Sequence, residues 1–177
     1  AEAGYRATEL SSQFPPDPAQ AKRDLRAHGL EPASTFLALN LRDPDLRSRE
    51  IERAEDRARY VRAVGSEVLI IADSGDARRE ALAGRVGSAK NLGPANAGSL
   101  DDTSWRRLAT GLEEVADRCA RKGVRIVFHN HVATYVETEP ELTRLLAMTD
   151  PERVGLCFDV GHLIYGGGDV MHVMERY

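Results

Sequence analysis

The sequence predicts a parallel α/β fold in a single domain. Short apolar runs typical of strands alternate with helical patterns along the chain, as in proteins whose parallel strands are joined by helices. A length of 177 residues suits one domain with a real core and is short for two. The hydrophobic content of 42% and the charged content of 29% are ordinary for a soluble globular protein.

Five segments have the pattern of strands. The clearest is the run at 67–73, which is apolar on both faces, as a parallel sheet covered by helices requires. The predicted strands are residues 6–10, 34–41, 67–73, 124–131 and 154–159.

Helical patterns lie between these strands and have recognisable ends. Asp43, followed by Pro44, is a start signal, and Thr138 with Glu141 forms a capping box. Counted with their caps, the predicted helices are residues 18–28, 43–65, 101–123 and 138–147, and the glycines at 166–168 open a last one. The segment 74–100 has weak periodicity, and a stretch of that length in a compact domain is usually functional or mobile.

Composition argues against two kinds of partner. The net charge of -4 gives no basic surface for nucleic acid. No apolar run approaches the roughly 18 residues of a membrane span, and no signal-like segment opens the chain. Cys119 and Cys157 share no metal or redox spacing, so we expect two reduced core residues. These features predict a cytoplasmic protein that binds neither nucleic acid nor membrane.

Two parallel architectures fit the pattern. A complete eight-stranded barrel typically needs about 250 residues, whereas a doubly wound sheet of five strands fits the length. The doubly wound fold usually binds its ligand through a Gly-rich turn after the first strand, and residues 11–16 contain no glycine there. The residue pattern alone leaves both architectures open.

Polar residues end every predicted strand. In a parallel barrel the carboxyl ends of the strands converge on one mouth, where active sites lie. Glu9, Asn40, Asp73 and Asn130 are therefore candidate substrate-binding residues. The alternative is that strand ends simply become polar where they reach solvent.

Three histidines are the strongest candidates for chemistry. On the strand at 124–131, His129 and His131 share one face, opposite the apolar residues that would pack under helices. Neutral imidazoles two residues apart on a strand are good metal ligands or general bases. His162 follows the next strand closely enough to join them.

Two carboxylates complete the candidate site. Asp159 would project from its strand into the same mouth, where a buried charge persists only if it is paired or bound to a cation; alternatively, it caps the following turn. Glu137 is either a ligand or a residue that favours the helix dipole at 138. Carboxylates with imidazoles suit Mn²⁺, Co²⁺, Mg²⁺ or Zn²⁺.

The runs HNHVATYVET at 129–138, GLCFDVGH at 155–162 and YGGGD at 165–169 resemble the sugar phosphate isomerase/epimerase family of xylose-isomerase-like barrels. Within it, the inosose (2-keto-myo-inositol) dehydratases are most similar, although Ala133 stands where they usually have glycine. Residues 3–10 are similar to the second strand of the family. Residues 83–85, which follow the strand at 67–73, are weakly similar to the family as well. The resemblance covers the whole chain and favours an incomplete TIM barrel, with strands two to six present and the first, seventh and eighth missing.

The resemblance also implies a metal centre. The family binds a divalent metal through a Glu near the fifth strand, an Asp from the sixth, a His from the seventh and a Glu from the eighth. Glu137 and Asp159 match the first two, and His162 matches a substrate-contacting histidine. His129 and His131 then become substrate-contacting or proton-transfer groups. The two remaining ligands are expected in a longer enzyme of which this chain is a fragment; the alternative is a half-barrel, inactive or completed by a partner.

The function implied is that of a divalent-metal-dependent lyase, with Mn²⁺ or Co²⁺ preferred. It would dehydrate a keto-polyol such as inosose through a metal-stabilised enediolate, in myo-inositol catabolism. One alternative is a metal-dependent sugar or sugar-phosphate isomerase/epimerase, and another is a non-catalytic polyol-binding or scaffold protein. Exposed edges of a five-stranded sheet favour a homo-oligomer over a free monomer.

Overall fold

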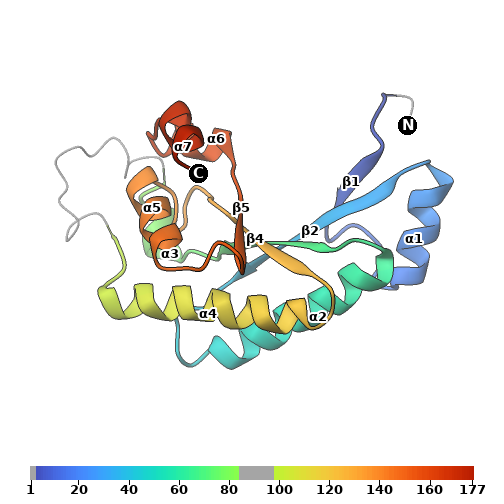
Figure 1. Cartoon of the computed structure of the whole chain (residues 1–177), viewed down its shortest axis with the longest axis horizontal. Helices are drawn as coiled ribbons and strands as arrows, with labels where there is room; N and C mark the ends of the chain where they lie inside the picture. The colour runs from blue at the N-terminus through green and yellow to red at the C-terminus, as the bar shows by residue number, and fades with distance from the viewer. Residues whose placement is uncertain (1–2, 84–97) are drawn as a thin grey trace.

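The computed structural model describes residues 3–83 and 98–177 (Figure 1). Its five strands lie in one parallel sheet and pair in sequence order. The strands are β1 (Ala7–Leu10), β2 (Glu31–Leu39), β3 (Val68–Asp73), β4 (Arg125–His129) and β5 (Val154–Cys157). The helices are α1 (Pro18–Ala27), α2 (Arg47–Val64), α3 (Ala77–Glu80), α4 (Asp102–Ala120), α5 (Glu139–Ala147), α6 (Val160–Tyr165) and α7 (Val170–Arg176).

The strand order distinguishes the two architectures that the sequence left open. A doubly wound sheet reverses its order at a switch point, whereas the strands of a barrel follow one another around the sheet. Here the order is β1-β2-β3-β4-β5 without reversal. The predicted parallel α/β fold is confirmed, and its arrangement is that of part of a barrel.

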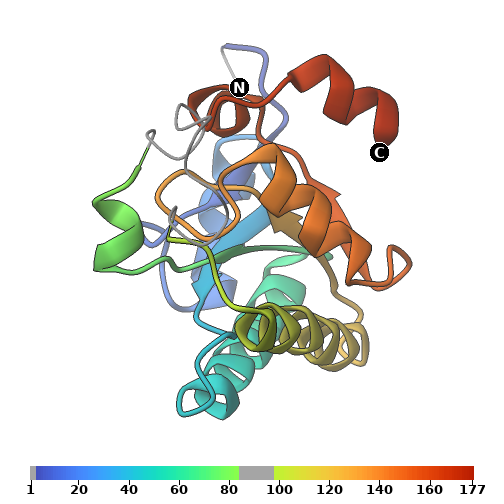
Figure 2. The same ribbon diagram turned by 90° about the vertical axis from the view of Figure 1, so that its left-hand side faces the viewer.

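The main core lies between one face of the sheet and the helices. Leu39, Ile71 and Phe128 from neighbouring strands pack against buried residues of α2, α4 and α5. Figures 1 and 2 show α2 and α4 lying side by side beneath the sheet, where they are in contact. A smaller cluster joins Leu10 of β1 to Leu25 of α1. The helices thus cover the outer face and leave the inner face for the site.

Local signals explain where most elements end. The carboxylate of Asp101 accepts a hydrogen bond from the backbone of Ser104 and caps α4. The capping box of Thr138 and Glu141 begins α5 as predicted. Gly65 ends α2 with a left-handed backbone, at φ 113°, a conformation that costs glycine little.

Several predicted boundaries differ from the structure. The second strand begins at Glu31 rather than 34, because its first residues pair with β1. The second helix begins at Arg47, since Asp43 accepts a hydrogen bond from the backbone of Asp45 and forms a turn instead of a cap. The strands β4 and β5 each end two residues early, and α6 was not predicted.

Part of the expected loop at 74–100 lies outside the described residues, as do residues 84 and 85 of the weakly similar stretch. Residues 77–80 of that loop form α3. Among the described residues, no helix is both long and apolar enough to span a bilayer.

Candidate functional site

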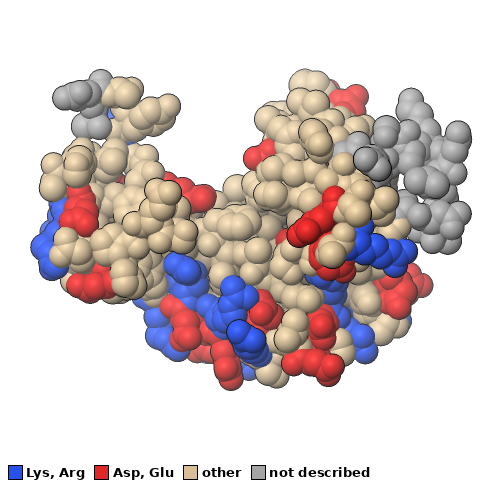
Figure 3. Space-filling view, turned by 180° about the vertical axis from the view of Figure 1, so that it is seen from behind, with Lys and Arg blue, Asp and Glu red and all other residues tan. Residues whose placement is uncertain are grey.

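The inner face of the sheet carries a cavity of about 390 Å³. Each strand contributes one residue to it, and the segments after β4 and β5 contribute the rest. The lining is Glu9, Phe36, Ile70, His129, His131, Cys157, Phe158 and Asp159. Figure 3 shows the molecule hollowed between the side of β1 and α1 and the side of α6 and α7, with few charged groups on the walls of the hollow.

Three histidines converge at this cavity. His129 ends β4, His131 follows it in the next turn, and His162 lies on α6. Their ligand atoms all lie within 4.8 Å of one another. The ring centroids of His131 and His162 are 4.0 Å apart, and those of His129 and His162 are 5.4 Å apart. The structure therefore brings the predicted catalytic histidines together.

Asp159 positions the third histidine. Its Oδ1 accepts a hydrogen bond of 2.7 Å from the backbone N–H of His162, so Asp159 is the N-cap of α6 and also lines the cavity. Asn130 fixes Asp159 in turn, because its side-chain amide donates to the backbone carbonyl of Asp159 and accepts from its N–H. Asn130 is fully buried and lies beneath the site rather than in the cavity lining.

Burial and neighbouring charges shift the pKa values of these groups. Burial lowers the pKa of His129 and of His162, and the neighbouring imidazoles lower both further, against the opposing effect of Asp159. Burial works against the ionisation of Asp159, yet the N–H of His162 and the nearby imidazoles hold its pKa below the ordinary value. Neutral imidazoles can accept a proton or bind a cation, so this arrangement favours both forms of chemistry.

Glu137 lies against the end of α6. A Cβ added at Gly166, the C-cap of α6, would come 2.6 Å from the backbone oxygen of Glu137 and 3.3 Å from its Cγ. The Glu137 side chain is fully buried, and its Oε2 accepts a hydrogen bond of 2.8 Å from the N–H of Ala133. Ala133 has a positive φ of 65°, a conformation that glycine adopts readily and other residues adopt rarely.

The structure does not bring Asp73 to the cavity. Its side chain is fully buried and pairs with the guanidinium of Arg42, while the N–H groups of Gly75 and Tyr135 donate to its Oδ2. Removal from water raises the pKa of Asp73, and Arg42 and the two amides act against that rise. The polar residue that ends β3 therefore pairs with Arg42, which follows β2, and does not reach the cavity.

The other two strand-end candidates differ from each other. Glu9 lines the cavity, and its carboxylate accepts a hydrogen bond from the hydroxyl of Ser34. Asn40 donates its N–H to Glu50, and its buried Oδ1 has no hydrogen-bond partner among the described residues. Glu9 is thus placed to meet a bound molecule, and Asn40 is outside the cavity lining.

Sequence reasoning missed several residues of the site region. Phe36 lies edge-on to His129, with ring centroids 5.7 Å apart, and period-two alternation on its strand could have indicated it. Cys157 lines the cavity and is half-buried rather than part of the core, and burial raises the pKa of its thiol. Arg42 and Arg79 are both buried, and no periodic signal marks them in the sequence.

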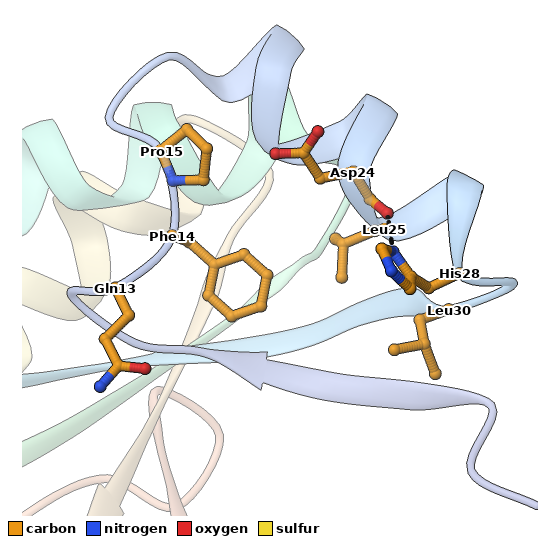
Figure 4. Close-up of a pocket in the computed structure, with 7 residues that line it drawn as sticks. All are labelled: Gln13, Phe14, Pro15, Asp24, Leu25, His28 and Leu30. Atoms are coloured by element: carbon orange, nitrogen blue, oxygen red, sulfur yellow. Dashed lines mark hydrogen bonds between the residues drawn. The ribbon is translucent and has the colours of Figure 1, made fainter. Parts of the chain in front are cut away.

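A second cavity of about 390 Å³ lies between α1 and the segments next to β1 (Figure 4). Its lining is Gln13, Phe14, Pro15, Asp24, Leu25, His28 and Leu30. The ring of His28 is already hydrogen-bonded at Nδ1 to the backbone oxygen of Asp24. The two cavities have about the same volume. Among the described residues, the cluster of three possible metal ligands, His129, His131 and His162, lies at the first cavity.

A parallel sheet in barrel order, with histidines and carboxylates at its carboxyl ends, defines a barrel protein with a polar site in the usual place for this class. The chain matches the xylose isomerase-like TIM barrel family over residues 1–177 and belongs to that family.

Two further comparisons give the degree of similarity. An inosose dehydratase of Lacticaseibacillus casei is 35% identical over 175 residues, covering 99% of this chain and 56% of the relative. This chain therefore spans about half the length of that curated relative. A sugar phosphate isomerase/epimerase structure from Parabacteroides distasonis superposes with a TM-score of 0.72 at 16% identity, covering 99% of this chain and 62% of the other.

A second solved structure is a xylose isomerase-like TIM barrel protein from Mycobacterium smegmatis in complex with magnesium. It superposes with a TM-score of 0.61 at 16% identity and covers 91% of this chain and 54% of that one. These structural likenesses support the fold.

Proposed function

We propose that this chain supplies part of the active site of a divalent-metal-dependent lyase that dehydrates a keto-polyol such as inosose. The observation that carries the proposal is the cluster of His129, His131 and His162, of which His129 and His131 line one cavity together with Asp159. The sequence identity of 35% to an inosose dehydratase supports the choice of substrate class. The same proposal makes the chain part of one longer barrel domain, active in the cytoplasm in myo-inositol catabolism.

The residues present fit a divalent cation. Three imidazole nitrogens lie within 4.8 Å of one another, and the carboxylate of Asp159 and the buried Glu137 flank the helix that carries His162. Mixed nitrogen and oxygen donors suit Mn²⁺, Co²⁺ or Zn²⁺ better than Mg²⁺, which prefers oxygen alone. Glu137 and Asp159 would hold the cation, with Mn²⁺ or Co²⁺ preferred. When bound, it would act as a Lewis acid toward negative charge beside a carbonyl group.

The histidines would move the protons. Dehydration removes a proton from the carbon next to the carbonyl and adds one to the departing hydroxyl, which leaves as water. The lowered pKa of His129 favours the neutral imidazole, which takes the carbon-bound proton. His131, 5.6 Å from His129 between ring centroids, delivers a proton to the hydroxyl, and His162 contacts the substrate. Glu9, across the cavity, accepts a hydrogen bond from another hydroxyl of the substrate.

The isomerase/epimerase alternative uses the same groups. Its support is the superposition on a sugar phosphate isomerase/epimerase at a TM-score of 0.72. In that reaction the proton returns to carbon and no hydroxyl leaves. Incubation of the full-length gene product with 2-keto-myo-inositol separates the two, because dehydration releases water and forms a new unsaturated ketone, whereas epimerisation conserves the mass.

Metal titration tests the centre itself. Calorimetric titration of the full-length gene product with MnCl₂, CoCl₂ and ZnCl₂ should show one site that weakens about tenfold or more in Asp159→Asn or Glu137→Gln. His28→Ala, in the second cavity, is the matched control and should bind as the wild type does. A full-length gene product that binds none of the three ions would overturn the proposal and favour a polyol-binding or scaffold protein. Equal loss in the His28 variant would contradict the location.

A further inference from the structure

Arg79 is a fully buried cation that the proposed reaction does not use. It is the one buried residue of α3, and its Nη2 lies 2.7 Å from Oε2 of Glu141. Its Nε lies 3.9 Å from Oε2 of Glu137. Buried charges are costly to remove from water and persist where partners hold them. Two carboxylates therefore face one guanidinium.

The contacts of Arg79 reach both ends of the turn that leads to α5. Oε2 of Glu141 also accepts the backbone N–H groups of Glu137 and Thr138, at 3.1 and 2.9 Å. Oε2 of Glu137 accepts the N–H of Ala133 from the start of the same turn. Arg79 thus bridges the side chain of Glu137 to a carboxylate that already fixes the Glu137 backbone.

Tyr135 packs α3 onto this turn. Its ring lies under two guanidinium groups, 4.7 Å from that of Arg42 and 5.6 Å from that of Arg79. Its hydroxyl donates a 2.7 Å hydrogen bond to Asp76, whose carboxylate also caps α3 through the N–H of Arg79. The backbone of Arg79 is therefore held at the same turn as its side chain.

We propose that Arg79 is a positioning residue that holds the carboxylate of Glu137 toward the metal site beside His162. The inference rests on the proposed function for its metal, but the geometry is independent of it. The cap of α5 alone does not require Arg79, because Glu141 already accepts both backbone N–H groups there. What Arg79 adds is a cation at the Glu137 side chain, which packs against the end of α6.

The test compares three variants in two measurements. Arg79→Met removes the cation, Arg79→Lys keeps the charge but loses the planar fork, and Glu141→Gln keeps the cap acceptor but removes the other carboxylate. The measurements are the affinity for Mn²⁺ by calorimetry and the position of the Glu137 carboxylate in crystal structures of the variants.

Arg79→Met should weaken Mn²⁺ binding about tenfold or more, as loss of a residue supporting a ligand does, with Arg79→Lys between it and the wild type. Glu141→Gln should lower the melting temperature and weaken Mn²⁺ binding less than Arg79→Met does, because its amide oxygen can still accept the two backbone N–H groups. If Arg79→Met does not fold, Arg79→Lys decides alone. An Arg79 variant with wild-type affinity and an unmoved Glu137 carboxylate would overturn the inference.

The two proposals fail separately. If the wild-type full-length gene product binds no Mn²⁺, the proposed function is wrong, and the carboxylate position in the Arg79 variants still decides the positioning role. A displaced carboxylate supports that role, and an unmoved one refutes it.

Discussion

Replacing Arg42 by methionine removes the cation from a buried ion pair while keeping much of its aliphatic volume. Arg42 and Asp73 have side-chain exposures of 8% and 0%. Arg42 also donates to the backbone oxygen of Gly75 and lies over the ring of Tyr135. The variant would leave the Asp73 carboxylate buried without its counter-ion.

The expected loss follows from these contacts. Breaking a buried pair by removing one partner costs roughly 3–5 kcal/mol. Asp73 keeps two backbone donors, the N–H groups of Gly75 at 3.0 Å and Tyr135 at 3.1 Å, which places the loss near the lower end. A loss of about 3 kcal/mol is a large part of the roughly 5–15 kcal/mol that stabilises a domain. With a urea m-value of about 2 kcal/mol/M, the midpoint should fall by about 1.5 M.

Equilibrium urea unfolding followed by circular dichroism measures this shift. Arg59→Met is the control, because Arg59 pairs with Asp56 at side-chain exposures of 56% and 69%, and such a surface pair contributes less than about 1 kcal/mol. Asp73→Asn in the Arg42→Met background should recover part of the loss, since it removes the unpaired charge. Equal effects in the Arg42 and Arg59 variants, or strictly additive effects in the double variant, would refute the reasoning.

Three further substitutions test local geometry. Gly166→Ala places a Cβ 2.6 Å from the backbone oxygen of Glu137 and should cost about 1–3 kcal/mol in urea unfolding; an unchanged midpoint would contradict that contact. Asp101→Ala removes a cap whose pKa the N–H of Ser104 holds below the ordinary 3.8. The difference in free energy of unfolding between the wild type and Asp101→Ala should be largest above pH 3.8 and should disappear as the pH falls through the lowered pKa of Asp101. A difference that stays constant in acid would argue against this role of the cap. Ala133→Gly relieves a φ of 65° and should raise the free energy of unfolding by at most about 1 kcal/mol, seen as a slightly higher melting temperature, because glycine also gains entropy when unfolded. A clear loss of stability would show that the methyl group packs usefully.

The sequence was sufficient for the sheet and for the convergence of the histidines. Buried parallel strands are continuous apolar runs, and their carboxyl ends meet at one edge, so His129 and Asp159 could be placed together from spacing alone. The alternation along the fourth strand also predicted which residues face the helices, as Phe128 in the core confirms.

The buried ionic contacts could not be predicted in the same way. Whether a polar strand end meets a cavity or a counter-ion depends on a partner far along the chain: Asp73 meets Arg42, which is 31 residues away, and Arg79 meets Glu141, which is 62 residues away. Such pairs leave no periodic signal. Only the packing of α3 on the turn before α5 brings Arg79 and Glu141 together.

Pairing in strict sequence order also sets how the sheet opens. Among the described strands, β1 pairs only with β2, over four residues and with a shifted register between Thr8 and Glu9. The small cluster with α1 is its main apolar support. Strands β3 and β4 each lie between two neighbours. In this chain by itself, amide protons of β1 should therefore exchange first, while those of β3 and β4 stay protected. When β1 separates locally from β2, Glu9 would leave the cavity while the three histidines stay in place. The side of the cavity formed by β1 would therefore open more often than the side formed by β4.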